Sequence, residues 1–267
     1  MSGVRYVILD PTGNLTALVT EKPSGADERE ITRRLMAESE QVAYLEPPTL
    51  PGSRARIRLM GGEFCGNAAM ACACYLAERE GIRPGEERHV PLEMSGMAGV
   101  MDCLVRAEGD GYTGAVPMPR VLEIIHPYEK DASLTAVRLE GITHLIREGT
   151  PFADRKEAEA FLLRQAELRP GDGALGLLQW EEQTLRMTPL VYVRDSGTLV
   201  WETGCGSGSA AIGAWRAWKQ GGGTVTTPVR QPGGVIQVCA GGNGGLPDAV
   251  SITGRVRIGE ERFCDNL

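Results

Sequence analysis

The sequence predicts two similar lobes, each built from both strands and helices. Short segments in which apolar and polar residues alternate recur along the whole chain and indicate half-buried strands. Each half also contains one charged helix and one helix of small apolar residues. A Cys-Gly pair stands directly before the small-residue helix in both halves, at Cys65 and at Cys205. This recurrence indicates an internal repeat.

In the first half, alternation predicts strands over residues 4–9, 15–20, 41–45, 55–59, 89–94 and 99–106. A helix over 26–38 carries few apolar residues among its charges and should lie on the surface. The helix over 66–80 is small and apolar on all sides, which is typical of a buried helix. Gly81 ends it.

The second half follows the same plan, with strands predicted over 136–139, 176–180, 185–193, 198–201, 235–239 and 249–258. A charged surface helix begins at Asp154, and a buried helix covers 206–220. We place the join near Pro117, so that residues 1–117 form the N-terminal lobe and 118–255 the C-terminal lobe. The last segment, 256–267, is expected to return to the first lobe. Clefts between lobes are common ligand sites.

Composition excludes several classes of partner. The 267 residues include 28 Lys plus Arg against 35 Asp plus Glu, and the formal charge is -7. An acidic chain without a basic run is poorly suited to nucleic acids or anionic membranes. No apolar run approaches the ~20 residues that cross a bilayer. The first residues do not resemble a signal peptide. We therefore expect a cytoplasmic protein with neither membrane nor nucleic-acid partners.

Two of the seven cysteines stand at predicted helix starts, namely Cys65 and Cys205. Unpaired N–H groups and the helix dipole lower the pKa of a thiol there and can hold an anion. Two facing helix starts could grip a carboxylate and put one sulfur on each side of an α-carbon. Racemisation by two bases requires that geometry. A single Cys-Gly turn would be structural, but the repeat favours catalysis.

Other features have simpler interpretations. A metal site at Cys65, Cys72 and Cys74 is disfavoured, because the last two lie within the buried helix and no histidine is close in sequence. His144 is expected to be a buried, hydrogen-bonded turn residue, since a two-thiol reaction gives it no required role.

These motifs resemble the diaminopimelate epimerase superfamily over nearly the whole chain. The resemblance rests on Gly62-Glu63-Phe64-Cys65-Gly66-Asn67, Cys205-Gly206-Ser207-Gly208-Ser209, Gly13-Asn14, and the segment from Glu40-Gln41 to Glu46-Pro47-Pro48. It implies an α+β fold of two pseudo-symmetric lobes, each a curled, mostly antiparallel β-sheet around a buried central helix. It also implies that no cofactor or metal is needed, and that the protein is a homodimer acting on a free amino acid.

The resemblance also implies roles for particular residues. Cys65 and Cys205 would be the acid/base pair, and Asn14 and Gln41 would line the site. Glu202 would receive the α-ammonium group, unless it belongs to a Glu-Thr pair that precedes the second cysteine in the family. The α-carboxylate would be held by the backbone N–H groups of Gly66, Asn67, Gly206 and Ser207.

Departures from the diaminopimelate enzymes concern the far end of the substrate. Thr203 stands where they carry an arginine, and Ile142 replaces an asparagine, so a distal ammonium and carboxylate would find few partners. The two cysteine motifs look most like the histidine racemases of opine-type metallophore pathways. The expected function is therefore histidine racemisation, with Glu46 or Glu63 facing the imidazole. Glu63 could equally be a carboxylate that only stabilises its loop.

Three other functions remain open from the sequence. Diaminopimelate epimerase would be recognised by direct assay. A non-catalytic binding protein of the same fold would bind an amino acid without exchanging its α-proton. An isomerase of the phenazine-biosynthesis type is disfavoured, because those proteins carry an acid in place of the cysteine pair.

Overall fold

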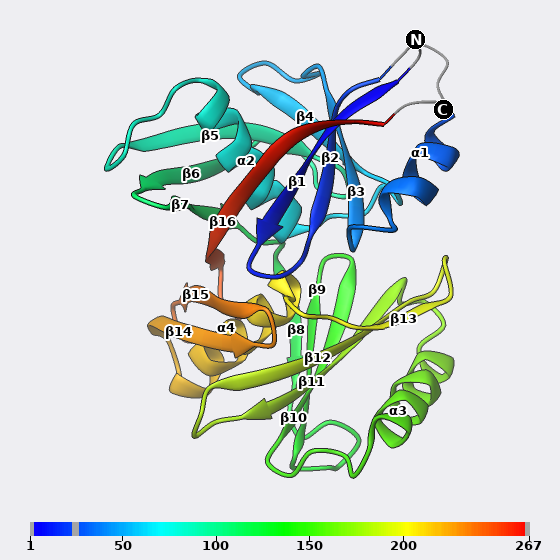
Figure 1. Ribbon diagram of the computed structural model, residues 1–267. Coiled ribbons are helices and arrows are strands. Elements are labelled where there is room, and N and C mark those ends of the chain that lie inside the picture. The colour runs from blue at the N-terminus through cyan, green and yellow to red at the C-terminus, as the bar shows by residue number, and fades with distance from the viewer. Residues whose placement is uncertain (1–2, 23–26, 265–267) are drawn as a thin grey trace. The chain divides into compact units, whose positions relative to one another are not determined.

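A computed structural model describes residues 3–22 and 27–264 of the chain (Figure 1). The chain divides into two compact units. Unit 1 contains the residues up to Pro117 together with those from Thr253 onward, and unit 2 runs from Met118 to Ile252. The last strand therefore passes into unit 1 at Thr253, three residues before the return expected at 256.

Unit 1 is a closed barrel of eight strands. The strands follow one another in chain order, and the last pairs back onto the first in antiparallel fashion. Two neighbouring pairs, β2–β3 and β4–β5, are parallel. The strands are β1 (Val4–Pro11), β2 (Thr16–Glu21), β3 (Gln41–Glu46), β4 (Ala55–Leu59), β5 (Glu87–Met94), β6 (Met101–Glu108), β7 (Gly111–Pro117) and β16 (Ala249–Cys264).

Helix α2 (Gly66–Arg79) is the buried helix of unit 1. It packs against β1 and β5–β7, and eleven of its 14 residues are buried. Small side chains allow this close packing: a Cβ at Gly114 of β7 would lie 2.5 Å from Cγ of Met70. The other helix, α1 (Glu28–Leu35), is capped by the Asp27 carboxylate and buries Ile31 and Leu35. It is shorter than the predicted 26–38, and residue 26 lies outside the described residues.

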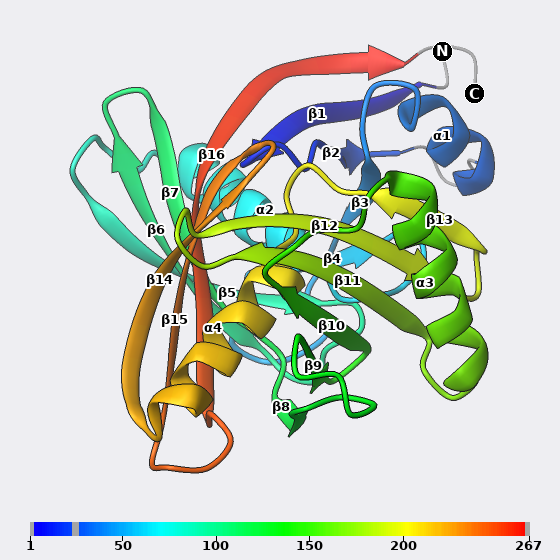
Figure 2. The same cartoon turned by 90° about the horizontal axis from the view of Figure 1, so that it is seen from below.

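Unit 2 is an open sheet. Its strands run in the order β16-β15-β14-β12-β11-β10-β9-β8, and β13 pairs with β12. Its buried helix is α4 (Gly206–Gln220), which lies along β14 and β15 (Figure 2), and its charged helix is α3 (Arg155–Leu168). The strands are β8 (Val121–Ile125), β9 (Leu134–Leu139), β10 (Ile142–Glu148), β11 (Ala174–Glu181), β12 (Arg186–Val193), β13 (Thr198–Trp201), β14 (Gly223–Gln231), β15 (Gly234–Gly242) and the first residues of β16.

The two units repeat one order of elements. In unit 1, α1 connects the parallel pair β2–β3 and α2 connects the parallel pair β4–β5. In unit 2, α3 connects the parallel pair β10–β11, and α4 lies between the parallel strands β12 and β14. Each buried helix is thus the second crossover of its unit. The described chain is a mixed α and β fold with four helices, and the internal repeat is visible in its topology.

Four strands were not predicted, namely β7, β8, β10 and β14. Strand β14 begins among glycines and contains Pro228, which are signals for a loop. Strand β10 begins directly after Gly141, at a position interpreted as a turn. Among residues 3–22 and 27–264, none of the helices has the length and apolar character that a membrane crossing requires.

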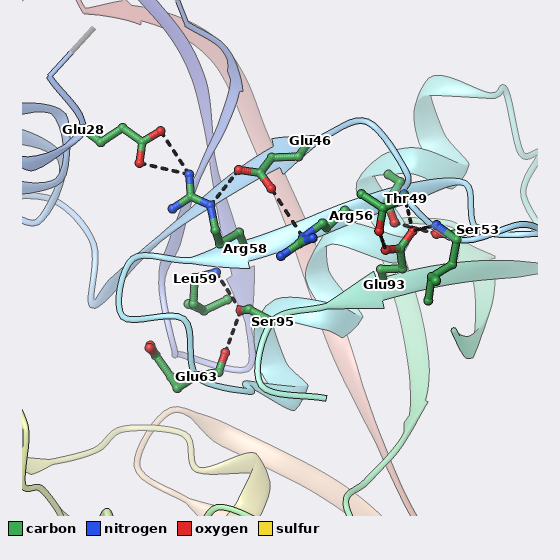
Figure 3. A network of polar contacts seen from close by, with 12 residues as sticks. Glu28, Glu46, Thr49, Ser53, Arg56, Arg58, Leu59, Glu63, Glu93 and Ser95 are labelled. Carbon is green, nitrogen blue, oxygen red and sulfur yellow. Dashed lines mark hydrogen bonds and ion pairs between the residues drawn. The ribbon is translucent and has the colours of Figure 1, made fainter. Parts of the chain in front are cut away.

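Glu93 of β5 fastens the loop between β3 and β4. Its carboxylate accepts hydrogen bonds from the Thr49 N–H at 2.7 Å, the Leu50 N–H at 2.9 Å and the Thr49 hydroxyl, with Ser53 beside it (Figure 3). These donors favour the ionised form and lower the pKa of Glu93 from 4.5 to about 2.

A carboxylate with a lowered pKa in the folded chain stabilises it above the unfolded pKa, and this stabilisation is lost as the pH falls from 4.5 towards about 2. We expect Glu93→Gln to lower the unfolding temperature by about 2–4 °C at pH 7. The difference from the unmodified chain should shrink below pH 4.5. Calorimetry across this pH range measures it, and a difference that stays constant down to pH 2 would contradict the assignment.

Candidate active site

Cys65 is the N-cap residue of α2. Its backbone is extended (φ −139°, ψ 112°), and its carbonyl accepts the first helical hydrogen bond, from the Ala69 N–H at 3.0 Å. The thiol is partly exposed and lies 4.0 Å from Oδ1 of Asn14. The first turn of α2 holds no acidic residue that would offset the positive end of the helix dipole. This sulfur therefore lies at a helix start, as the sequence predicts.

Asn14 is the centre of a buried polar network beside Cys65. Its Oδ1 accepts hydrogen bonds from Gln41 Nε2 at 2.8 Å and from Asn67 Nδ2 at 3.4 Å. Its Nδ2 donates to the Glu40 carboxylate at 2.8 Å. Asn14, Gln41 and Asn67 are each less than a tenth exposed. The structure thus brings Asn14, Gln41 and Asn67 together with Cys65, and it adds Glu40, which the sequence analysis did not single out.

Removing the Asn14 amide should therefore disturb the surroundings of Cys65. We expect Asn14→Ala to lower the rate of α-proton exchange in an amino acid about tenfold or more, because the buried Gln41 amide loses a hydrogen-bond partner and the exposed Glu40 carboxylate is no longer held. Asn243→Ala, in an exposed loop of unit 2, is the control and should exchange normally. Proton NMR in heavy water measures the rate. Unchanged exchange in the Asn14 variant would exclude the network from the site.

The turn that follows β5 holds the loop before Cys65 through hydrogen bonds. The Ser95 hydroxyl donates to the Glu63 carbonyl at 2.8 Å and accepts the Leu59 N–H at 3.0 Å (Figure 3). Gly96 lies so close that an added Cβ would be 2.2 Å from the Phe64 nitrogen. The Glu63 side chain is exposed and folds back over Gly61, where a Cβ would lie 2.2 Å from its Oε2.

Glu46 belongs to a different network. Arg58 Nε donates to Glu46 Oε1 at 2.6 Å, and Arg56 Nε lies 3.5 Å from its other oxygen. Arg58 also pairs with Glu28 of α1, so that three elements are joined (Figure 3). The Glu46 carboxylate thus pairs with two arginines and does not take part in the Asn14 network. The sequence could not reveal this, because it follows from the register that sets Glu46 opposite Arg56.

Cys205 is the N-cap residue of α4, with an extended backbone (φ −113°, ψ 107°). Its sulfur accepts the Gly208 N–H at 3.2 Å and lies 3.6 Å from Oγ of Ser207. Its own N–H donates to Gln231 Oε1 at 2.6 Å. Gln231 also donates to Ser209 Oγ at 2.9 Å, and that hydroxyl donates to the Cys205 carbonyl at 2.8 Å. The end of β14 thus fixes the start of α4.

The ionisation of Cys205 differs from the expectation for a helix start. Burial raises the pKa of its thiol well above the ordinary value, and the neighbouring Glu202 carboxylate raises it further. Hydrogen bonds from the Ser207 hydroxyl and the Gly208 N–H lower the pKa of this thiol, but by less than burial and Glu202 raise it. The prediction of a lowered pKa is therefore wrong for this cysteine, which is a thiol at neutral pH. Glu202 lies beside that thiol.

His144 of β10 lies in the same part of unit 2. It is fully buried, and its Nε2 lies 3.0 Å from the Ser207 hydroxyl. Burial lowers the pKa of this imidazole to about 3, so the ring is neutral at physiological pH. It is buried and hydrogen-bonded, as expected, but it belongs to a strand. In the described part of the chain, no three His, Cys, Asp or Glu side chains gather as a metal site would require.

Comparison with known families matches nearly the whole chain to one group of enzymes. A family profile described as "Histidine racemase CntK N-terminal domain" matches residues 3–261. The histidine racemase of Staphylococcus aureus (strain Mu50) is 25% identical over 266 residues, which cover 95% of this chain and 94% of that protein. A histidine racemase of Fusobacterium nucleatum is 28% identical over 220 residues, or 78% of each chain.

Solved structures show the same fold at lower identity. A hydroxyproline epimerase from Agrobacterium vitis, with bound trans-4-hydroxy-L-proline, superposes with a TM-score of 0.70 at 14% identity. The match covers 99% of this chain and 94% of that one. Proteins of the PhzF family are among the other structures of similar fold. The structural neighbours thus include racemases, epimerases, PhzF-family proteins and a methylitaconate isomerase.

Proposed function

Because this chain belongs to the histidine racemase family, we propose that it interconverts L- and D-histidine by passing the α-proton between two thiols, without a cofactor. One observation carries the mechanism. In both units, a cysteine is the N-cap of the buried crossover helix, and buried polar side chains lie behind it. A two-base reaction needs one such group for each face of the α-carbon.

The two thiols have different roles in the resting enzyme. We assign the proton donor to Cys205, whose pKa is raised, and the base to Cys65, which is partly exposed at the start of α2. The Cys65 thiolate takes the α-proton, and the electron pair that remains is delocalised into the α-carboxylate. Cys205 then donates its proton to the other face, and the two sulfurs have exchanged roles. We propose that the carboxylate binds the N–H groups that open both helices, those of Gly66, Asn67, Gly206 and Ser207.

Acidic side chains would hold the positive groups of the substrate. We assign the α-ammonium to Glu202, which lies beside the Cys205 thiol. We assign the imidazole to Glu40 in place of Glu46 or Glu63. Glu40 is bonded to Asn14 of the Cys65 network, whereas Glu46 is paired with Arg58 and Glu63 folds back over Gly61. Asn14 and Gln41 would keep the orientation of Glu40 fixed.

A substrate panel tests the function. Purified protein is incubated with L-histidine, diaminopimelate and a range of other L-amino acids, and the products are separated by chiral chromatography. We expect L-histidine to approach an equal mixture of enantiomers without any added cofactor. Turnover of diaminopimelate alone would make the chain an epimerase of that substrate. Histidine binding without deuterium uptake in heavy water would make it a binding protein.

We propose a cytoplasmic homodimer that serves metallophore biosynthesis, with a diaminopimelate epimerase-like arrangement of pseudo-symmetric lobes. The repeated order of elements supports this fold, and the odd number of cysteines supports a reducing compartment. Light scattering coupled to size-exclusion chromatography tests the dimer.

A further inference from the structure

His144 occupies a position that the repeat assigns to the active site. The glycines before β2 and β10, Gly13 and Gly141, have matching conformations (φ 92° and 93°). His144 is the third residue after Gly141, as Thr16 is the third residue after Gly13, so the two positions correspond. The strand pairing agrees, since Thr16 pairs with Gln41 and His144 pairs with Gly176 in the corresponding parallel ladder.

In both units, a hydrogen-bond network that includes one of these positions extends to the second residue after the cysteine. In unit 1, Gln41 donates to Asn14, which also accepts from Asn67, two residues after Cys65. In unit 1 the smaller residue of the pair, Thr16, is on the first strand and the larger, Gln41, on the second. In unit 2 the larger residue, His144, is on the first strand and the smaller, Gly176, on the second. Gly176 replaces the glutamine, and the His144 imidazole fills the space and reaches Ser207, two residues after Cys205. An added Cβ at Gly176 would be 2.1 Å from His144 Nδ1.

The surroundings of the ring determine its tautomer. His144 Nδ1 is buried against Gly176 and has no hydrogen-bond partner among the described residues. A proton on Nδ1 would therefore be a buried donor without an acceptor, which is costly. With the proton on Nε2 instead, the ring donates to Ser207 Oγ at 3.0 Å. The hydroxyl hydrogen of Ser207 is then available to the Cys205 sulfur, 3.6 Å away.

We propose that His144 is a positioning residue: its Nε2–H holds the Ser207 hydroxyl so that it donates to the Cys205 sulfur whenever that sulfur is a thiolate. The inference rests on the proposed two-thiol function. Cys205 must lose its proton in every turnover, although its burial and Glu202 both oppose the charge. The Ser207 hydroxyl and the Gly208 N–H are the two donors that offset them.

The test measures the Cys205 thiolate directly, without relying on turnover. The rate of iodoacetamide labelling of Cys205 is followed against pH by peptide mass spectrometry, in His144→Ala, Gly176→Ala and Ser207→Ala. Gly176→Ala retains the imidazole but displaces it. We expect labelling to become about tenfold slower at a given pH below the thiol pKa, which corresponds to a rise of about one unit. His144→Gln, which restores an N–H donor, should recover most of the rate.

A double variant separates positioning from general support of the fold. If His144 acts through Ser207, then His144→Ala added to Ser207→Ala should slow labelling no further. His126→Ala, which removes another histidine–hydroxyl contact of unit 2, to Thr135, is the control and should leave labelling unchanged. Additive losses in the double variant, or normal labelling in Gly176→Ala, would overturn the proposal.

The same variants are assayed for racemisation and for thermal unfolding. We expect kcat to fall about tenfold in parallel with the labelling rate, and the unfolding temperature of Gly176→Ala to identify any general loss of structure. If the variants slow Cys205 labelling but the unmodified protein racemises no amino acid, the proposed function is rejected and the hydrogen bonds from His144 through Ser207 to Cys205 are supported. Normal labelling in an active racemase would reject the hydrogen-bond chain alone.

Discussion

Cys205→Ser and Cys65→Ser are each expected to lower the rate of histidine racemisation about 1,000-fold or more, while the protein stays folded. A hydroxyl is somewhat smaller than a thiol and gives up its proton far less readily, and positioned acid/base groups contribute on the order of 100- to 10,000-fold. Both sulfurs lie at N-caps whose backbone conformation serine also accepts. Chiral chromatography gives the rate, and circular dichroism verifies the fold.

The isotope content of early product distinguishes two bases from one. In heavy water, D-histidine formed by the unmodified chain should carry deuterium at the α-carbon, while the remaining L-histidine should not, because different thiols serve the two faces. Cys239→Ser, in β15, is the matched control and should racemise normally. Wild-type rates in either of the Cys65 and Cys205 variants would end the two-thiol mechanism.

The second large effect is expected at Gly96, which does not contact the substrate in the proposed mechanism. Gly96→Ala would place a Cβ 2.2 Å from the Phe64 nitrogen and 2.6 Å from the Glu63 carbonyl carbon, at a residue with φ +72°. Backbone atoms cannot yield as a flexible side chain does, so the loop that leads into Cys65 must move. A shift of about 1 Å at a reacting group can reduce the rate about 100-fold.

Gly99→Ala is the control for this effect. Gly99 lies in the same turn with φ +81°, but the space around its missing Cβ is open. Both variants therefore carry the strain of a left-handed alanine, about 1–2 kcal/mol, and the Gly96 variant alone carries the clash. We expect kcat/KM to fall about 100-fold for Gly96→Ala and less than threefold for Gly99→Ala. If kcat/KM falls equally in the two variants, backbone strain alone explains the effect and the clash with Phe64 does not.

The sequence predicted the buried helices well because their signals are local. Small apolar residues on every side, a cysteine and glycine at the start and a glycine at the end define α2 and α4 without any knowledge of the sheet. Strands β7 and β14 were missed because glycine and proline, which usually indicate loops, are tolerated there by the barrel and by the open sheet.

The parts of the site that could not be predicted depend on pairing between distant segments. Glu46 meets Arg56 through the register of β3 and β4, and Gln231 reaches Cys205 from the end of β14. The raised pKa of Cys205 comes from burial, which outweighs the helix start that a sequence pattern reveals. Glu40 gave no signal of its own, because its contact with Asn14 depends on the parallel pairing of β2 and β3.

Strand β16 has a consequence for the order in which the protein is made. It completes the barrel by pairing with β1, so β1 is synthesised well before the strand that closes the ring. Unit 2, with the exception of a few residues of that strand, is synthesised in between. A chain truncated shortly before Thr253 would therefore retain nearly all of the second unit but would lack the strand that closes the first.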